Sequence, residues 1–366
     1  MESYNTTETY RYRDEENDKF FEISYGFNGA KVAYNMLGEV TSKRYQVVYN
    51  QGKTGTFGRH KFNFYETESE SLTEVKKLVD ARIKQGYTRC DNMYIDERGR
   101  RRFDDGEVSE INEQPSEVVH ATYFYRDEKS DKFWRYEYVD NVLLINYGKT
   151  GSIGRFKLTE FDDDEACEKK VNALVKSKMK KGYKLDDAFD MNTCIYAITN
   201  EEDEEVGFHL LTSHPKFRKH FTDDFYYDCT DEEAPFGSDE GWDTFYLIVD
   251  EVRQNKAFNF IEQLPEIVSY DGSMTYYPPT DLTYEVVEKL LKEDEMHLTN
   301  SDMAVYATAF SQIKITGRID SELKELALNA MKRKLITDKI LGYDEDSTVL
   351  TKMISDLDSF FNYRRN

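Results

Sequence analysis

Two short segments of this chain carry basic side chains at alternate positions beside aromatic ones. Residues two apart on a strand point to the same face of a sheet, so each set would form one basic surface. Such a surface can hold phosphate groups with its cations and stack a base or a sugar on its rings. A solvated sheet face would show the same pattern and is the alternative interpretation. The candidate ligand-binding residues are Lys53, Arg59 and Lys61 in the first segment and Tyr147, Lys149, Arg155 and Lys157 in the second.

The lysines of both segments stand in a Gly-Lys-Thr triplet, which invites comparison with a nucleotide-binding P-loop. That loop requires a further glycine five positions before the glycine of the triplet. The two corresponding positions hold Val47 and Leu143. Both segments therefore lack the P-loop motif, and the sequence contains no serine- or cysteine-nucleophile signature and no dinucleotide-binding motif.

A dense group of acidic residues between positions 223 and 243 is the candidate for metal chemistry. Its spacing does not match a calcium-binding loop, and the nearby histidines have no zinc-ligand spacing. Solvated carboxylates at helix starts are the favoured interpretation. An enzyme is the less favoured hypothesis, and in that case Asp223, Asp228, Asp239 and Glu240 would be the cation ligands. We therefore expect no catalytic residue, no bound metal and no cofactor.

The two basic segments belong to a longer internal repeat. The decapeptide GKTGTFGRHK of residues 52–61 recurs as GKTGSIGRFK in residues 148–157, 96 positions later. The tetrapeptide KQGY of residues 84–87 recurs as KKGY in residues 180–183 at the same offset. Two motifs in one constant register indicate two copies of one domain, and a repeated module usually serves recognition. The first copy carries about 17 extra residues around positions 26–43, which we interpret as a loop or hairpin.

Each copy predicts a small antiparallel sheet packed against one helix. Residues 45–49 and 142–147 are rich in β-branched and aromatic side chains, which is typical of strands. The glycines that follow permit a tight turn, and a second short strand comes next. Apolar residues at positions 75, 78, 79 and 83 then recur at helical spacing, and the positions 96 further on repeat this apolar face. Gly86 and Gly182 are placed to end these helices in the left-handed conformation.

The chain changes character after residue 190. Amphipathic patterns predict several helices, of which the clearest begins after Ser238 and others lie around Val287, Tyr306, 323–331 and 349–361. Residues 191–366 hold 17 Lys and Arg against 35 Asp and Glu, whereas the preceding residues hold 32 against 36. This half is therefore strongly acidic, so it repels phosphate backbones and favours a basic partner.

The bulk properties indicate a folded, soluble protein. No apolar stretch reaches the roughly 18 residues of a membrane span, and the first residues have no apolar core of a signal peptide. The four cysteines, Cys90, Cys167, Cys194 and Cys229, are scattered without metal-site spacing and fit reduced thiols. We therefore expect a cytoplasmic protein.

The order of motifs over residues 10–190 resembles the WGR domain, which is named for a Trp-Gly-Arg triplet. The resemblance rests on an aromatic-rich strand, the Gly-Lys-Thr-Gly-x-x-Gly-Arg turn, a helix and the closing Lys-x-Gly-Tyr. Gln51 and Tyr147 stand at the Trp position, and Lys53 and Lys149 at the Arg position. The resemblance implies a tandem WGR protein similar to bacterial proteins described as like a molybdate-metabolism regulator. In poly(ADP-ribose) polymerases, the domain contacts DNA ends and relays activation.

A second resemblance covers residues 214–241, which are similar to a region attached to WGR modules in uncharacterised bacterial proteins. It implies a bacterial origin but no activity. The expected architecture is therefore α+β, with two small antiparallel-sheet-plus-helix WGR-like modules at 10–110 and 115–190, followed by an acidic, mainly α-helical domain at 205–366.

We expect a non-enzymatic binding protein that recognises nucleic acid or a nucleotide-like ligand through its repeats. The second copy is the predicted binder, because Tyr147 has a ring that can stack on a base or sugar and Gln51 has none. The alternative hypothesis, from a different class, is an inhibitory or immunity-like protein that captures a basic protein partner through residues 191–366.

Overall fold

The computed structural model divides into two compact units, Met1–Gln114 and Pro115–Asn366. Antiparallel sheets occupy the first unit and the start of the second, and helices fill the rest of the second. The predicted combination of antiparallel sheets with a helical C-terminal region is therefore confirmed. The residues that the structure describes are 5–14, 17–27, 33–34, 40–41, 44–55, 58–95, 101–104, 117–161, 164–199, 209–229, 231–269, 272–343 and 348–361.

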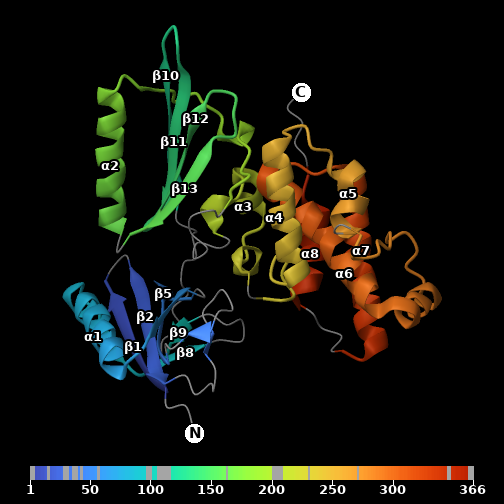
Figure 1. Ribbon diagram of the computed structural model, residues 1–366, viewed down its shortest axis with the longest axis horizontal. Helices are drawn as coiled ribbons and strands as arrows, with labels where there is room; N and C mark the ends of the chain where they lie inside the picture. The colour runs from blue at the N-terminus through green and yellow to red at the C-terminus, as the bar shows by residue number, and fades with distance from the viewer. Residues whose placement is uncertain are drawn as a thin grey trace. The chain divides into compact units, whose positions relative to one another are not determined.

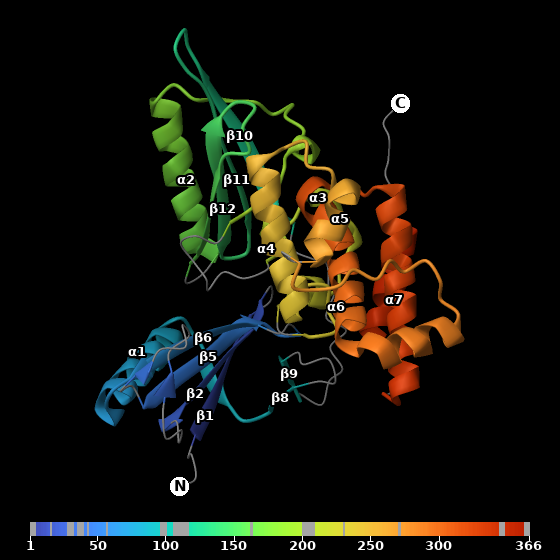
Figure 2. The same cartoon turned by 45° about the vertical axis from the view of Figure 1, so that its right-hand side comes forward.

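The first unit contains a five-stranded antiparallel sheet in the order β6-β5-β2-β1-β7. One helix, α1, covers one of its faces (Figure 2). The core between them holds Tyr10, Phe21, Ile23 and Val47 from the sheet and Val75 from the helix. The elements of the sheet layer are β1 (Asn5–Arg13), β2 (Asp18–Phe27), β5 (Tyr45–Lys53), β6 (Arg59–Tyr65), α1 (Glu68–Lys84) and β7 (Thr88–Cys90).

Two small ladders complete the first unit. The strands β3 (Ala33–Tyr34) and β4 (Val40–Thr41) pair with each other, as do β8 (Met93–Ile95) and β9 (Arg101–Phe103). The pair β3–β4 lies in the predicted extra segment 26–43. Residues 28–32, 35–39 and 42–43 of that segment are outside the described residues.

Local signals explain the ends of α1. Thr67 and Glu70 form a capping box, in which the Thr67 hydroxyl accepts from the Glu70 N–H and the Glu70 carboxylate accepts from the Thr67 N–H. Gly86 follows the helix with φ +94°, as predicted. The prediction that position 83 faces the core is wrong, because Ile83 is 53% exposed. In the last turn, Arg82 points inward instead.

The second unit begins with a sheet of the same strand order, β13-β12-β11-β10-β14. The helix α2 lies along one face of this sheet (Figure 1). Met179, the counterpart of Ile83, is likewise exposed rather than buried as predicted. The elements are β10 (Val119–Arg126), β11 (Asp131–Val139), β12 (Val142–Lys149), β13 (Arg155–Glu160), α2 (Asp164–Lys180) and β14 (Lys184–Leu185).

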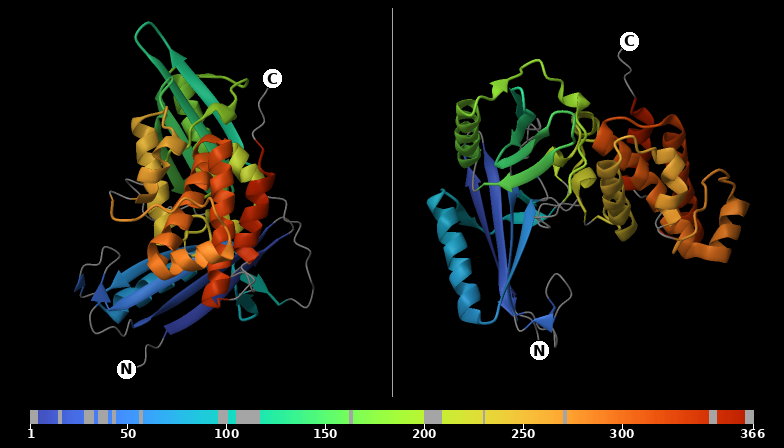
Figure 3. Two further views of the ribbon diagram at one scale, coloured as in Figure 1. Left: turned by 90° about the vertical axis from the view of Figure 1, so that its right-hand side faces the viewer. Right: turned by 45° about the horizontal axis from the view of Figure 1, so that its top comes forward.

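The opposite face of this sheet is covered by the chain that follows it. Val142, Leu144 and Leu158 from the strands pack with Tyr196 and Leu211. Both faces of the sheet therefore pack against other elements, and the helical region is joined to it directly (Figure 3). Short 3₁₀ turns in this connection and the next lie at η1 (Met191–Thr193), η3 (Leu210–Thr212) and η4 (Asp224–Tyr227).

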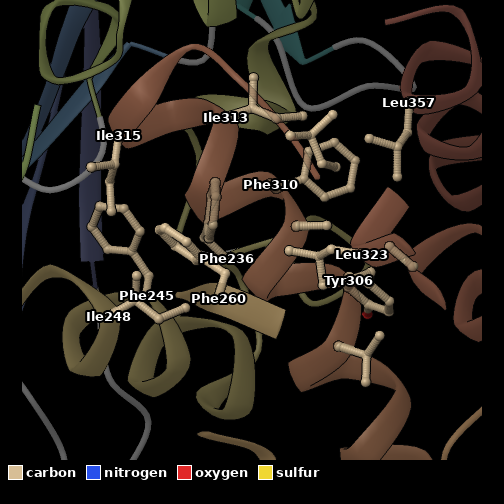
Figure 4. Packing of buried hydrophobic residues seen from close by; sticks show 14 of the residues in the cluster. Phe236, Phe245, Ile248, Phe260, Tyr306, Phe310, Ile313, Ile315, Leu323 and Leu357 are labelled. Atoms are coloured by element: carbon tan, nitrogen blue, oxygen red, sulfur yellow. The ribbon is translucent and has the colours of Figure 1, made fainter. Parts of the chain in front are cut away.

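Helices α3 to α8 follow in the second unit and pack mainly around an aromatic-rich core, with a smaller apolar cluster between the start of α6 and the end of α7. Phe236, Phe245, Phe260 and Phe310 meet at the centre of the aromatic-rich core, as Figure 4 shows. The predicted start at Ser238 is confirmed, since its hydroxyl accepts from the Gly241 N–H. The helices are α3 (Pro215–His220), α4 (Asp239–Gln254), α5 (Phe260–Ser269), α6 (Tyr284–Thr316), α7 (Ser321–Leu341) and α8 (Thr348–Ser359).

The helices predicted separately around Val287 and Tyr306 are the two helical segments of α6, which a kink separates. This helix changes direction at Asp294, whose φ and ψ of −163° and 76° are not helical. In the described part of the chain, none of the helices combines the length and apolar character needed to cross a membrane.

Candidate nucleic-acid interface

The glycine-rich turn between β12 and β13 is held closed by the buried side chain of Asn146. Its amide nitrogen donates to the carbonyl oxygens of Ile153 and Arg155, both at 3.1 Å. Its amide oxygen accepts from the Arg135 Nε at 2.7 Å. Gly154 has φ +81°, and a side chain there would come within 2.8 Å of the Tyr147 carbonyl oxygen. The turn therefore requires glycine at position 154.

The threonine of the Gly-Lys-Thr triplet fastens this turn to the β10–β11 hairpin. The Thr150 N–H donates to the Asp131 carbonyl at 3.1 Å, and its hydroxyl donates to the Asp131 carboxylate at 2.6 Å. That hydroxyl bond is the main reason that the pKa of Asp131 lies below its usual range. In the first unit, Thr54 makes the same two bonds to Asp18, both at 2.9 Å. The threonine is thus structural in both sheets.

The second set of predicted site residues lies on one face of its sheet. Trp134, Tyr147 and Arg155 are directly opposite one another on β11, β12 and β13, so their side chains share a face. It is the face that carries α2, because Leu143, four residues before Tyr147, packs against that helix. Tyr147 is 43% exposed, whereas Trp134 is buried beneath the end of α2.

The basic side chains extend this row along the strands. Lys149 and Lys157 each lie two residues from a member of the row and therefore point to the same side. Lys149, Arg155 and Lys157 are all exposed. The structure thus places the four predicted residues of the second segment on one surface, which we call the Tyr147 surface. It is defined by Tyr147, Lys149, Arg155 and Lys157.

Sequence reasoning missed a fifth member of this neighbourhood, Lys178 in the last turn of α2. Its Nζ lies 5.4 Å from the centroid of a Trp134 ring and 5.0 Å from that of Tyr183. Burial lowers the pKa of this lysine, and Lys181 lowers it further. The sequence does indicate this location, because Lys178 stands four residues before Gly182 and therefore in the last turn of the helix. Side chains on a helix lean toward its N-terminus, which brings that of Lys178 over the sheet.

The equivalent positions of the first unit are arranged differently. Gln51 lies opposite Phe21, as Tyr147 lies opposite Trp134. The Gln51 amide oxygen accepts from the Arg82 guanidinium, which also donates to Gln85 at 2.8 Å. Arg82 is 8% exposed and lies 5.1 Å from the Phe21 ring centroid. Gln51 therefore stabilises a buried arginine.

Of the other predicted residues in the first unit, Lys53 and Lys61 are half-buried on β5 and β6. Lys61 lies opposite Tyr49, and Arg59 lies opposite Gln51. The side chain of Arg59 is outside the described residues. The backbone register thus repeats that of the second sheet. At the position of the exposed Tyr147, however, the first sheet has Gln51, which has no aromatic ring.

Comparison with known proteins identifies the domain that contains these residues. Residues 120–190 match the model of the WGR domain, which is a nucleic-acid-binding type of domain. Over 240 residues, the chain is 43% identical to the uncharacterized protein YfeS of Escherichia coli strain K12, which covers 65% of this chain and 97% of that protein. The chain belongs to the same family as YfeS.

Two further similarities are narrower. Protein YehF of the same organism is 41% identical over 61 residues, which are 17% of this chain and 22% of YehF. A solved structure of a Bacteroides fragilis protein has 24% identity over 30% of this chain and 31% of its own, with a TM-score of 0.19. That score is too low to support any argument about the fold.

The helical region holds the glycine turn of the WGR domain. Arg253 of α4 donates to the carbonyl oxygens of Ala197 at 2.8 Å and Gly154 at 3.3 Å. Lys256 donates to the Gly151 carbonyl. Ile153 is buried in the helical core. The turn that carries the Tyr147 surface is therefore bonded to α4 and the loop after it.

A second connection lies on the far face of the WGR sheet. Glu137 is 2% exposed and accepts from the Tyr196 hydroxyl at 2.8 Å and from the Arg218 guanidinium. Arg135 donates to the Cys194 sulfur, and burial raises the pKa of that thiol to about 11. Cys194 is therefore a protonated, structural thiol at neutral pH.

The acidic residues proposed as cation ligands do not form a metal site in the described part of the chain. No three His, Cys, Asp or Glu side chains among the described residues are arranged to hold a metal ion. Asp223 instead pairs with Lys352 at 2.9 Å, and Asp239 begins α4. The geometry gives no support to the enzyme hypothesis built on Asp223, Asp228, Asp239 and Glu240.

Proposed function

We propose that the chain binds nucleic acid through the Tyr147 surface of its WGR domain. The observation that carries the proposal is the row of Trp134, Tyr147 and Arg155 across three strands. The exposed ring of Tyr147 can stack on a base or sugar, and the exposed Lys149 and Lys157 can contact phosphates on either side of it. The protein then acts as a binding protein without chemistry of its own.

We also propose that the first unit is a second WGR module, so that the chain is a tandem WGR protein. The family model matches residues 120–190 only, and the support for the first copy is internal. Both sheets have the same strand order, both helices have 17 residues, and Thr54 repeats the bonds of Thr150. We place the modules at 10–110 and 115–190 and the acidic domain at 205–366.

In this proposal the two modules have different roles. The second presents an exposed tyrosine, whereas the first uses Gln51 to bind its own Arg82. The first module is therefore mainly structural, and the ligand is held by the second. Lys53, Arg59 and Lys61 are the weaker candidates for ligand contact.

Fluorescence anisotropy with labelled blunt and nicked duplexes tests the proposal. The whole chain is required, because Tyr196, Ile198 and Leu211 cover one face of the WGR sheet and a fragment 115–190 would expose that core. We expect binding at low salt that weakens steeply as salt is added, since phosphate contacts release counterions. An absence of binding to both duplexes at low salt would overturn the proposal.

A second proposal concerns the acidic domain and rests on charge alone. Residues 191–366 carry an excess of 18 carboxylates over Lys and Arg, which can attract a basic protein rapidly. A pull-down with the whole chain should recover a basic protein that is released at high salt. Recovery of neutral or acidic proteins only would contradict this proposal.

A further inference from the structure

The helical domain contains a cavity of about 740 Å³ that the WGR interface does not use. It lies where the end of α4 and the start of α5 meet the turn between α6 and α7. Its apolar wall includes Val252, Phe260 and Ile319, which are buried, and the half-buried Phe258. The volume is in the range of about 300–1,000 Å³ that is usual for small-molecule sites.

The charged side chains around this cavity are mainly cations. Lys216, Lys256 and Arg318 line it, against one carboxylate, that of Asp320. This balance is the reverse of the surrounding region, in which acidic residues outnumber basic ones by 35 to 17. Three cations at one cavity make the local potential more positive, which favours an anionic ligand there.

The single carboxylate does not neutralise these cations. Asp320 accepts from the Gln312 amide nitrogen at 2.6 Å, and its own N–H donates to the Gln312 amide oxygen at 2.9 Å. Among the described residues, neither Lys216 nor Arg318 has an ion-pair partner. Lys256 donates to the Gly151 carbonyl, which is neutral.

We propose that this cavity binds a small phosphomonoester whose organic part carries a flat aromatic ring, as a nucleoside monophosphate does. Arg318 and Lys216 together match the two negative charges of a phosphate monoester, and the planar guanidinium can donate two parallel hydrogen bonds to it. Phe258 and Phe260 supply the surface on which a ring can lie. A carboxylate with a single charge would leave one of the two cations without a partner.

Lys256 connects the cavity with the WGR domain. Lys256 lines the cavity, and its Nζ donates to the Gly151 carbonyl of the glycine turn. A substitution of Lys256 would therefore disturb the turn as well as the cavity. Arg318 and Lys216 are the better positions for a test, because the structure shows no side-chain hydrogen bond from either to a described residue.

The test is isothermal titration calorimetry of the whole chain with AMP, adenosine and inorganic phosphate. We expect AMP to bind and the other two to bind at least about tenfold more weakly, because each lacks one half of the contacts. Arg318→Gln and Lys216→Gln should each weaken AMP binding by roughly tenfold or more, the usual effect of losing a charge-assisted hydrogen bond. Lys289→Gln, which removes one exposed lysine of α6, is the matched control and should bind AMP as the wild type does.

Circular dichroism melting of each variant confirms that it is folded. The proposal is overturned if AMP does not bind at millimolar concentration, or if both cavity variants bind it as tightly as the control. It is also overturned if Tyr147→Ala abolishes AMP binding while Arg318→Gln retains it, since AMP would then occupy the Tyr147 surface. If the chain binds AMP but not DNA, only the nucleic-acid binding proposed for the WGR domain is contradicted.

Discussion

Gly317, at the end of α6, lies against the imidazole ring of His214, at the start of α3, so closely that no side chain fits between them. The same two segments are joined by a hydrogen bond from the His214 N–H to the Lys314 carbonyl at 2.8 Å. The His214 Nδ1 accepts from the Lys216 N–H at 3.1 Å and so caps α3. This contact fixes α3 on the helical core.

Replacement of Gly317 by alanine should destabilise the second unit strongly. The residue has φ +65°, which costs an alanine about 1–2 kcal/mol, and the added methyl group would overlap the His214 ring, at a further cost of about 1–3 kcal/mol. We expect the free energy of unfolding in urea to fall by roughly 2–5 kcal/mol.

Gly342→Ala provides the matched control for this substitution. Gly342 ends α7 with φ +77°, but a side chain there would meet nothing within 4 Å. Only the backbone cost of about 1–2 kcal/mol should remain. Equal losses of stability in the two variants would show that the contact between Gly317 and His214 carries no energy.

The stability of the second unit should fall as the pH is lowered from 6.5 to 4. Burial, with a smaller contribution from the nearby Lys216, Arg218 and Arg318, lowers the pKa of His214 to about 4, against the raising effect of the Asn192 carbonyl. The unfolded chain therefore binds a proton in this range that the folded chain does not. Protonation of His214 should therefore lower the free energy of unfolding by roughly 3 kcal/mol between pH 6.5 and pH 4.

Urea unfolding of the wild type and of His214→Asn at pH 7 and pH 4.5 measures this contribution. Asparagine can cap α3 in the place of the imidazole but does not titrate. The variant should therefore lose less stability between the two pH values than the wild type does. If both lose the same amount, His214 is not the group responsible.

The sequence was sufficient to predict most features that depend on local pattern, although the helical spacing wrongly placed Ile83 and Met179 in the core. The repeat, the strands before the glycine turns, the helix ends at Gly86 and Gly182 and the shared face of Arg155 and Lys157 all follow from spacing. The contact of Lys178 with Trp134 and the hydrogen bond from Arg82 to Gln51 did not follow, because they join the end of a helix to a strand more than 30 residues away. The bonds from Arg253 and Lys256 to the glycine turn span about 100 residues and have no periodic signal.

Tyr147→Ala should weaken DNA binding, whereas Gln51→Ala should not. The exposed ring of Tyr147 provides a stacking surface, and its loss should cost roughly 1–3 kcal/mol of binding free energy. Gln51→Ala should instead lower the stability of the first unit, because it leaves the buried Arg82 without one of its acceptors. Anisotropy with a nicked duplex and thermal unfolding of both variants separate the two effects. The reverse ranking in the binding assay would mean that the first module holds the ligand.

The salt dependence of DNA binding should identify the phosphate contacts. Each phosphate contact adds about 0.9 to the slope of log K against log salt. If Lys149, Arg155 and Lys157 all contact phosphates, replacing the three by glutamine should lower the magnitude of that slope by roughly 2–3. The measurement is anisotropy with one duplex at several salt concentrations.

The matched control removes the same charge from another part of the same domain. Lys169, Lys170 and Lys176 are exposed on α2, and replacing these three by glutamine leaves the Tyr147 surface unchanged. The control should alter the affinity slightly, through the net charge, and leave the slope close to that of the wild type. If the two triple variants lower the slope equally, binding depends on the overall charge of the domain, and the Tyr147 surface is not the interface.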